Sequence, residues 1–474
     1  MSDKFNSYRY KTQPYEHQKK VLKDSWAELY YAYLLEMGTG KSKCAIDNIG
    51  MLYEDNKINA VLIIAPKGVM DNWSKGEIPV HLPDRIPRIV CGWTPSSSKK
   101  FAEELKHITY HKTNDLKFFV MNVEAFSTSK GTKAAYEFLL KNPENMVVVD
   151  ESTTIKNRKA ARTKNIMELR NVSLYRRILT GSPVTKSPMD LFSQCFFLSP
   201  RALGFNSYYA FQNRYAQVQS RTMGNRSFQE IVGYRRLDEL NEKLLSFSNR
   251  TLKEDCLDLP EKIYTRRHIE LTDEQLTVYT QMKKLALAQL QNGDLATTES
   301  VLTQIMRLQQ ICCGFFQPDE GAIQPLANNR LSGLMSVIDE CSGKAIIWAS
   351  YTYDIQRIAQ ALRDRFGPDS VATYFGGTPQ KDRQDIVNKF QDADSDLRFF
   401  VGQPKTGGFG ITLTQARTVI YFSNSYDLEI RLQSEDRAHR ISQKKSVTYV
   451  DLVSPNTIDE KVLSALRKKI GLAG

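Results

Sequence analysis

The feature that most constrains the fold is a set of short apolar runs, rich in β-branched residues, that recur with helix-length segments between them. The first series comprises 61–67, 117–123, 146–151 and 176–182, and the second comprises 344–350, 398–403 and 418–424. Near-continuous apolar runs of this length are typical of parallel strands that are buried on both faces. Two such series, far apart in the sequence, predict two sheets. The fold class that we expect is therefore α/β, with two parallel-sheet domains.

The chain between the two series has a different pattern. Apolar residues at helical spacing occupy 271–291 and 299–313, and strand signals are few. We therefore expect a mainly helical insertion at 199–328, which joins a first domain at 1–198 to a second domain at 329–474.

One part of this insertion predicts a β-hairpin. In 216–236, alternating residues flank Gly224 and Asn225, a pair that favours a tight turn. The segment holds four arginines against one acid, Glu230, and they are Arg221, Arg226, Arg235 and Arg236. A basic arm that touches DNA and a solvated hairpin that fills a gap between domains both fit this pattern.

Length, targeting signals and cysteine usage limit the class of protein. At 474 residues the chain is too long for one compact core, and it closes with an amphipathic helix at 457–470 for which Thr457 is the predicted N-cap. The opening segment is charged, and no apolar run approaches the roughly 18 residues of a membrane span. The seven cysteines show no paired metal-ligand spacing, which is typical of reduced thiols. We therefore expect a cytoplasmic protein without a membrane partner.

The charge balance favours a polyanionic partner. The chain has 65 Lys and Arg residues against 53 Asp and Glu residues, for a formal net charge of +12. Nucleic acid fits such an excess, and a generally basic soluble protein is the alternative.

A glycine-rich turn in LLEMGTGKSKCAI lies between an apolar strand end and a helix-forming segment. Gly38 and Gly40 allow backbone N–H groups to surround phosphate oxygens, and the N-terminus of the following helix favours negative charge. Lys41 would reach the outer phosphates, and Ser42 offers a hydroxyl to Mg²⁺. The strict P-loop pattern has glycine where this chain has Leu35, so the match is to the shorter GxGKS form.

Two carboxylates end the buried strand in VVVDESTTIKN. Asp150 is suited to bind Mg²⁺, and Glu151 is suited to orient and deprotonate an attacking water. A strand-end turn with a helix-capping acid is the alternative, which the phosphate loop upstream makes weaker. LTGSP (179–183) ends another strand, and Gln18 precedes the phosphate loop, where its amide could read an adenine edge.

Two arginines three residues apart, Arg437 and Arg440, lie in QSEDRAHRISQ. On a helix they would share one face, so both guanidinium groups could point at one target. The alternative is a solvated helix in which Glu435 and Asp436 neutralise the arginines.

In their order along the chain, these segments resemble the Swi/Snf branch of the helicase-like ATPases of superfamily two, in the compact form of phage or bacterial members. The matching segments are DESTTIKN, LTGSPVTKSPMDLFSQCFFLSP, NRTLKEDCLDLPEK, LQQICCG, GGFGITLTQARTVIYF and EDRAHRISQ. The resemblance implies two RecA-like domains that close on ATP and Mg²⁺. It also implies that the second domain supplies Arg437 and Arg440 as arginine fingers.

The resemblance assigns roles to single residues. ATP would contact Gln18, Met37, Gly38, Thr39, Gly40, Lys41, Ser42 and Gln433, and Mg²⁺ would bind at Ser42 and Asp150. The catalytic residues would be Lys41, Asp150, Glu151, Arg437 and Arg440. Residues that couple ATP hydrolysis to movement would be Thr180, Ser182, Gly408 and Gly410.

By the same resemblance, DNA would cross the strand ends of both domains. The predicted contacts are Lys67, Trp73, Lys405 and Thr406, with Arg221 and Arg226 of the hairpin added. Contacts to phosphates fix register without reading bases, so we expect little sequence preference. For Trp73, packing beneath its loop is the alternative to stacking on a base.

The chain departs from the family pattern beside the carboxylates. The family's Asp-Glu-Ala-His is replaced by Asp-Glu followed by Ser152 and Thr153, so any coupling contact of that histidine must be made differently. Ser182 replaces a threonine and keeps the hydroxyl.

The function that we expect is an ATP-dependent motor on duplex or branched DNA, able to work as a monomer in replication, recombination or repair alongside other proteins of those processes. One alternative is a duplex translocase that displaces bound proteins without unwinding. Others are an ATP-gated nucleic-acid clamp and a structural DNA-binding protein with an inactive site. The chemistry alone leaves RNA open as the substrate.

Overall fold

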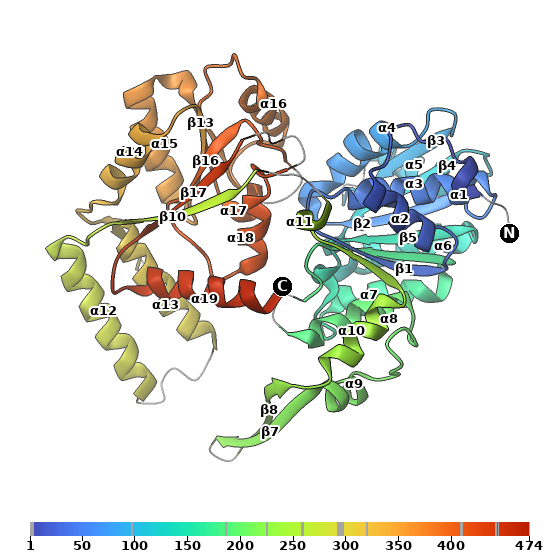
Figure 1. Ribbon diagram of the computed structural model, residues 1–474, viewed down its shortest axis with the longest axis horizontal. Coiled ribbons are helices and arrows are strands. Elements are labelled where there is room, and N and C mark those ends of the chain that lie inside the picture. Colours follow the sequence, from blue (N-terminus) through green and yellow to red (C-terminus); the bar gives the residue numbers. More distant parts are fainter. Residues whose placement is uncertain are drawn as a thin grey trace. The chain divides into compact units, whose positions relative to one another are not determined.

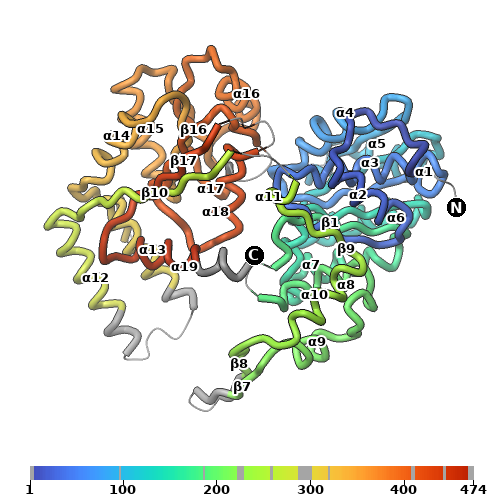
Figure 2. The backbone as a smooth tube through the Cα atoms, viewed as in Figure 1, coloured from blue at the N-terminus to red at the C-terminus, as the bar shows by residue number. Residues whose placement is uncertain are grey.

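The computed structural model describes residues 4–95, 98–184, 187–223, 226–256, 260–291, 298–318, 321–407, 411–440, 443 and 445–473. The chain forms two compact units, Met1–Leu257 and Asp258–Gly474, and each is built on its own sheet. Figure 1 shows the elements of both units, and Figure 2 traces the backbone through them.

The first unit contains a seven-stranded parallel sheet in the order β3-β4-β2-β5-β6-β1-β9. Its strands are β1 (Tyr30–Leu35), β2 (Ala60–Ala65), β3 (Arg88–Gly92), β4 (Leu116–Asn122), β5 (Asn145–Asp150), β6 (Tyr175–Leu179) and β9 (Ser248–Thr251). Every residue of β2 and β5 is buried, which explains their apolar sequences. The predicted first series corresponds to β2, β4, β5 and β6, so this part of the prediction is confirmed.

Helices cover both faces of this sheet (Figure 1). They are α1 (Lys4–Ser7), α2 (Glu16–Ser25), α3 (Lys41–Glu54), α4 (Ile78–His81), α5 (Lys99–Tyr110), α6 (Ser129–Lys141), α7 (Ala161–Glu168), α8 (Leu191–Leu198), α9 (Tyr208–Tyr215), α10 (Leu237–Leu245) and α11 (Lys253–Cys256). Phe138 of α6 and Ile166 of α7 share a core with Leu62 of β2 on one face. On the other face, buried Arg177 of β6 donates to Asn48 Oδ1 of α3. The carboxyl ends of the central strands are thereby held at one edge, where α/β sheets place their ligands.

The second unit contains a six-stranded parallel sheet in the order β10-β17-β16-β13-β15-β14. Its strands are β10 (Lys262–His268), β13 (Lys344–Trp348), β14 (Val371–Tyr374), β15 (Phe399–Gly402), β16 (Ala416–Tyr421) and β17 (Val447–Val453). The predicted second series corresponds to β13, β15 and β16. The two-sheet α/β fold class is confirmed.

The helices of the second unit are α12 (Asp273–Gln291), α13 (Thr298–Cys313), α14 (Arg330–Glu340), α15 (Thr352–Phe366), α16 (Gln380–Gln391), α17 (Pro404–Gly407), α18 (Leu428–Glu435) and α19 (Ile458–Ala473). A short ladder pairs β11 (Phe315–Phe316) with β12 (Gln324–Pro325). Buried Arg330 ties several elements together, because it donates to Asp459 Oδ2 of α19 at 2.7 Å and to the carbonyl oxygens of Phe422 and Leu452. Thr457 caps α19, since its hydroxyl accepts from the Asp459 N–H.

The segment 199–328 differs from the expected helical insertion, because it is divided between the two units. β9 pairs with β1 in the first sheet, and β10 pairs with β17 in the second. β9 (SNRT) and β10 (KIYTRRH) are edge strands of mainly polar sequence, so they lack the apolar run that marks the central strands.

The hairpin expected at 216–236 is present in the structure. β7 (Ala216–Met223) pairs antiparallel with β8 (Arg226–Tyr234), in the lower part of Figure 1. Gly224 and Asn225, the predicted turn residues, lie outside the described residues.

Among the residues that the structure describes, no helix combines the length and hydropathy that crossing a membrane requires.

Candidate functional site

The glycine-rich loop connects β1 to α3 at the carboxyl edge of the first sheet. Gly38 and Gly40 have φ angles of 87° and 89°, a region that side chains with a Cβ rarely adopt. Thr39 closes the turn, since its N–H and its hydroxyl both donate to the Glu36 carbonyl oxygen. The N-terminus of α3, which begins at Lys41, follows directly. The N–H groups of its first turn and the helix dipole favour an anion at this position.

Gln18 supports this loop from beneath. Its Nε2 donates to the Thr39 carbonyl oxygen at 2.9 Å, and its Oε1 accepts from the Tyr15 N–H at 3.0 Å. His17 Nε2 lies 2.9 Å from the same Thr39 oxygen. A Cβ at Gly40 would come within 2.2 Å of Gln18 Nε2, so the loop lies directly on the amide. Gln18 is buried and holds the loop through both amide atoms, and its contact with adenine stays a prediction.

Lys41 and the paired carboxylates meet in front of the loop. Lys41 Nζ lies 3.1 Å from Glu151 Oε1, and both side chains are nearly buried. Glu151 has a left-handed backbone, with φ 46°, which is strained for a residue with a side chain. Such strain is typical of functional sites, and here it accompanies a carboxylate that the lysine contacts at the end of β5.

Asp150 is held by two donors. Its Oδ1 accepts from the Glu151 N–H at 2.9 Å, and its Oδ2 accepts from the indole Nε1 of Trp73 at 2.8 Å. Burial raises the pKa of Asp150, and the neighbouring Glu151 carboxylate raises it further, while Lys41 and the Trp73 N–H oppose the shift. A buried carboxylate in this environment favours a cation beside it.

The predicted DNA contact of Trp73 is wrong. Its side chain is fully buried and its N–H is directed at Asp150, so it packs beneath the loop, the alternative that the sequence also allowed. Lys67, at the start of the same segment, is exposed and remains a predicted DNA contact. Trp73 lies in a π-helical turn, Asn72–Glu77, a distortion that is frequent at functional sites.

The loop after β6 lies against the phosphate loop. A Cβ at Gly181 would be 3.0 Å from the Met37 nitrogen, so the two backbones are in contact. Thr180 is buried, and its hydroxyl accepts from the Ser182 N–H at 3.2 Å. The residues expected to couple hydrolysis to movement in the first unit are therefore placed beside the nucleotide loop.

Gln194 of α8 connects this loop to the carboxylates, and the sequence did not single it out. Ser152 donates from Oγ to Gln194 Oε1 at 2.7 Å. Gln194 Nε2 donates to the carbonyl oxygens of Pro183 at 2.8 Å and Asp190 at 2.9 Å. Ser152, which departs from the family's Asp-Glu-Ala-His, is thus one end of a buried polar bridge. The signal that could have found Gln194 is a lone amide in the otherwise apolar stretch LFSQCFFL, because a buried amide needs partners.

In the second unit, Arg437 and Arg440 reach the same segment. Arg437 Nη1 donates to the Ile411 carbonyl oxygen at 3.1 Å, and Arg440 Nη1 donates to Thr412 Oγ1 at 2.6 Å. They lie in turns after α18, which ends at Glu435, so the prediction that both stand on a helix is wrong. Their function as arginine fingers stays a prediction.

The other site residues of the second unit lie nearby in the sequence. Gln433 is buried, and its Nε2 donates to Glu429 Oε1 at 3.3 Å, so its contact with ATP stays a prediction. Lys405 is exposed on α17, and the Thr406 N–H donates to the Gln403 carbonyl oxygen at 3.0 Å. Gly408 and Gly410 lie outside the described residues.

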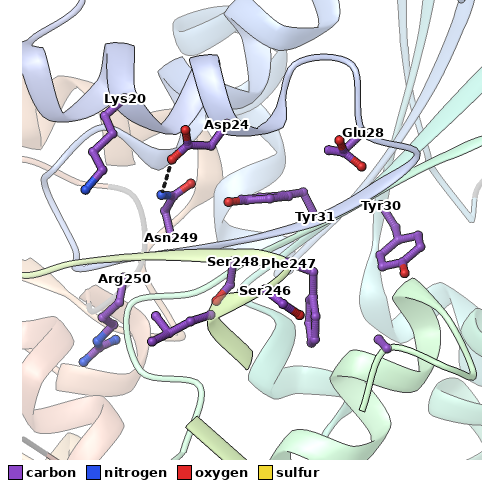
Figure 3. A pocket seen from close by; sticks show the side chains of 12 residues that line it. Lys20, Asp24, Glu28, Tyr30, Tyr31, Ser246, Phe247, Ser248, Asn249 and Arg250 are labelled. Carbon is purple, nitrogen blue, oxygen red and sulfur yellow. Dashed lines mark hydrogen bonds between the residues drawn. The ribbon is translucent and has the colours of Figure 1, made fainter. Parts of the chain in front are cut away.

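A separate hollow of about 600 Å³ lies along β9 (Figure 3). Side chains of both charges line it, including Lys20, Asp24 and Arg250, and Asp24 accepts from Asn249 at 2.9 Å. No residue of the phosphate loop lines this hollow. Its mixed charges favour neither an anion nor a cation, so we do not include it in the site.

The residues present fit ATP with Mg²⁺. The left-handed glycines, a helix N-terminus and Lys41 suit phosphates, and Asp150 with Ser42 offers hard oxygen ligands. Among the described residues, no three His, Cys, Asp or Glu side chains converge as a metal cage. Mg²⁺ is usually bound by one or two protein groups together with substrate phosphates.

Fold and site together define a helicase-like ATPase core. A family model for the SNF2-related domain matches residues 34–316, more than half of the chain, and a model for the helicase conserved C-terminal domain matches 329–442. The chain therefore belongs to the SNF2-related family.

Relatives extend this likeness over almost the whole chain. It is 26% identical to the SWI/SNF chromatin-remodeling complex subunit snf22 of Schizosaccharomyces pombe, over 93% of this chain and 26% of that protein. It is also 26% identical to the uncharacterized ATP-dependent helicase MG018 of Mycoplasma genitalium, over 92% of this chain and 39% of that protein. The chain thus spans roughly a quarter to two fifths of the length of these relatives. A solved structure, the Sulfolobus solfataricus SWI2/SNF2 ATPase core in complex with dsDNA, has 24% identity and a TM-score of 0.42, covering 98% of this chain and 93% of that one.

Proposed function

We propose that this protein is an Mg²⁺- and ATP-dependent motor that translocates on DNA and acts on forks and junctions. The observation that carries the proposal is the cluster formed by the glycine loop, Lys41 and the Asp150–Glu151 pair at the carboxyl edge of one sheet. This arrangement has the parts that phosphoryl transfer to water requires, namely a phosphate cradle, a metal ligand and a base.

Each residue of the cluster has a separate task in the proposed hydrolysis. The loop N–H groups and Lys41 Nζ hold the outer phosphates, and Asp150 with Ser42 holds Mg²⁺. The metal, when bound, neutralises charge that develops on the phosphate oxygens. Glu151 orients the attacking water and accepts its proton, and Lys41, 3.1 Å away, keeps this carboxylate in position until phosphates compete for the lysine.

Arg437 and Arg440 are proposed to reach the nucleotide as the second unit closes on the first. Their positive charge would stabilise the transition state only in the closed state, which makes hydrolysis depend on domain closure. Repeated closure and opening is then the movement that carries the protein along DNA. The Ser152–Gln194 bridge is the proposed connection between the carboxylates and the loop of Thr180 and Ser182.

DNA as the track is supported by charge and by relatives. The chain has a formal net charge of +12, and exposed lysines such as Lys67 and Lys405 suit phosphates. Relatives include a chromatin-remodeling subunit and the probable ATP-dependent DNA helicase CHR12 of Arabidopsis thaliana, which is 26% identical over 92% of this chain. A role in replication, recombination or repair, with partners from those processes, is part of the proposal.

The test is steady-state ATPase activity with no nucleic acid, single-stranded DNA, linear duplex, a fork, a four-way junction and an RNA duplex. Strong stimulation by forks and junctions, lost in Arg440→Ala, is the expected result. Equal stimulation by plain duplex would favour a translocase that displaces bound proteins. Few ATP molecules hydrolysed per binding event would favour a clamp, and no stimulation by any DNA would overturn the proposal.

A further inference from the structure

We propose that the first unit carries a second DNA-contact surface, which recognises an unpaired base at a DNA branch through Tyr209 and the neighbouring backbone through basic residues. This inference rests on the proposed function, since it names the feature that distinguishes forks from plain duplex. The surface is formed by the segment 156–164, the start of α9 and the base of the β7–β8 hairpin, and we call it the branch surface.

Arg158 joins the parts of the branch surface. Its guanidinium carbon lies 4.2 Å from the ring centre of Tyr208 and 5.1 Å from that of Tyr209. Its Nη2 also donates to the Tyr209 hydroxyl at 3.4 Å. Both tyrosines open α9, which leads directly into β7. The chain that follows the catalytic carboxylates is therefore in contact with the helix that carries the hairpin.

The two tyrosines have different surroundings. Tyr208 is partly buried and packs edge-on against Phe192, with 5.6 Å between ring centres, so it anchors the pair to the core. Tyr209 is 64% exposed, which is unusual for so large a ring. It contributes little to the core, and a cation holds it in place. A fixed, exposed aromatic ring is the platform on which unpaired bases stack, whatever their sequence.

Arg158 contacts the platform and lowers the pKa of Tyr209, Lys159 lies close enough to lower it further, and both belong to a basic segment. The segment 156–164 has five cations and no acid, and the cations are Lys156, Arg158, Lys159, Arg162 and Lys164. At the base of the hairpin, Arg235 and Arg236 follow β8 and add two more cations. The carboxylate of Glu239 on the adjacent α10 forms an ion pair with Arg214 and accepts a hydrogen bond from the Tyr215 hydroxyl. The net charge of the branch surface is strongly positive, as a phosphate backbone requires.

The hairpin is fixed at its base. Val218 of β7 and Ile231 of β8 pack against the core of the first unit. Arg235, just after β8, donates from Nη2 to the Asn213 carbonyl oxygen of α9 at 2.6 Å. Val232, 52% exposed, and Tyr234 face solvent on alternate positions of β8. The arm is thus anchored to the same helix as the platform, and it can oppose a force from DNA.

An unpaired base is the occupant that fits best. In plain duplex the bases are stacked on one another, so only phosphates are offered and the tyrosine gains nothing. At a fork or junction an unstacked base is available, and stacking is worth about 1–3 kcal/mol per base, which corresponds to roughly five- to 150-fold in affinity. Stacking on Tyr209 would therefore add affinity for branched DNA alone, whereas the cations of the branch surface would contact the phosphates of either DNA.

The test measures binding of a fluorescent fork and of a duplex of equal length by anisotropy, at two salt concentrations. Tyr209→Ala should weaken fork binding about tenfold and leave duplex binding and the salt dependence unchanged. Tyr209→Phe, which keeps the ring, should bind as the wild type does. Tyr136→Ala removes another exposed tyrosine of the same unit and is the matched control. Lys159→Ala should lower the salt slope by about one for both DNAs.

Position can be read independently with a fork that carries 5-iodouracil in its single-stranded arm. Photo-cross-linking to the peptide that contains Tyr209 would support the inference. If DNA stimulates the ATPase activity of the wild type and Tyr209→Ala still prefers forks to duplex as strongly as the wild type does, the branch surface is overturned. The proposed motor function would then remain intact. A wild type that neither binds nor responds to any DNA would overturn both.

Discussion

The indole Nε1 of Trp73 donates to Asp150 Oδ2 at 2.8 Å, across 77 positions of sequence. With the Glu151 N–H on Oδ1, this bond fixes both oxygens of the carboxylate proposed to hold Mg²⁺. Trp73 lies in the segment that begins with exposed Lys67, a proposed DNA contact. The buried indole ring of Trp73 therefore connects a candidate DNA-binding segment to Asp150, the proposed metal ligand.

Trp73→Phe removes the N–H and keeps most of the ring. Because partners that orient a metal ligand typically contribute ten- to hundredfold to metal affinity, the Mg²⁺ concentration for half-maximal binding of a fluorescent ATP analogue should rise about tenfold. Trp93→Phe, at another buried tryptophan of the same unit, is the control. Equal Mg²⁺ dependence of the two variants would show that the indole bond does not position Asp150.

The bridge from Ser152 to Gln194 should behave as one unit. Ser152→Ala and Gln194→Leu each leave buried polar groups without partners, so each should lower the free energy of unfolding by roughly 1–3 kcal/mol. The double variant should lose less free energy of unfolding than the two single variants together, because it removes both partners of the Ser152–Gln194 hydrogen bond. Denaturant unfolding of the four proteins measures the coupling, and strict additivity would exclude the bridge.

Gly40→Ala should abolish tight nucleotide binding. The new Cβ would meet Gln18 Nε2 at 2.2 Å, and the φ angle of 89° disfavours alanine, so the loop must move. We expect a loss of about 1–3 kcal/mol in stability and nucleotide affinity at least tenfold weaker. Gly92→Ala, where a Cβ meets nothing within 4 Å, should be neutral. Equilibrium binding of the fluorescent ATP analogue by both variants measures this difference, and equal affinities would contradict the prediction.

Stability of the second unit should depend on the protonation of Asp354. Burial raises the pKa of this residue to about 6 from an ordinary 3.8, against opposing effects of Arg357 and Arg330. The folded chain then binds the proton of Asp354 more tightly than the unfolded chain does. Proton binding therefore contributes fully to the free energy of unfolding below about pH 4, and this contribution is lost as the pH rises towards 6.

Asp354→Asn removes that titration. Relative to the wild type, the variant should gain roughly 1–3 kcal/mol between pH 4 and pH 6, as measured by denaturant unfolding at several pH values. If the free energy of unfolding of the wild type instead rises relative to that of the variant between pH 4 and pH 6, the ion pair of Asp354 with Arg357 outweighs the effect of burial.

The central strands and the loops at their ends could be predicted from the sequence because parallel strands buried on both faces leave an apolar run that ends abruptly in functional residues. β9 and β10 could not, because edge strands carry no such run. These two strands divide the segment that the sequence predicted to be one helical insertion between the two units.

Burial excludes the DNA contact predicted for Trp73, because the fold turns this side chain inward, where it holds Asp150. The sequence also did not indicate that Gln18 holds the phosphate loop. Whether a polar or aromatic side chain faces a ligand depends on packing between segments far apart in sequence, which a local motif does not encode.

A motor driven by ATP hydrolysis at this site should displace the third strand of a DNA triplex on a linear duplex. We expect displacement by the wild type with ATP and none by Glu151→Gln, which keeps the loop and Lys41 but lacks the base. Release of the third strand that is equally fast without ATP, or in Glu151→Gln, would contradict a motor driven by this site.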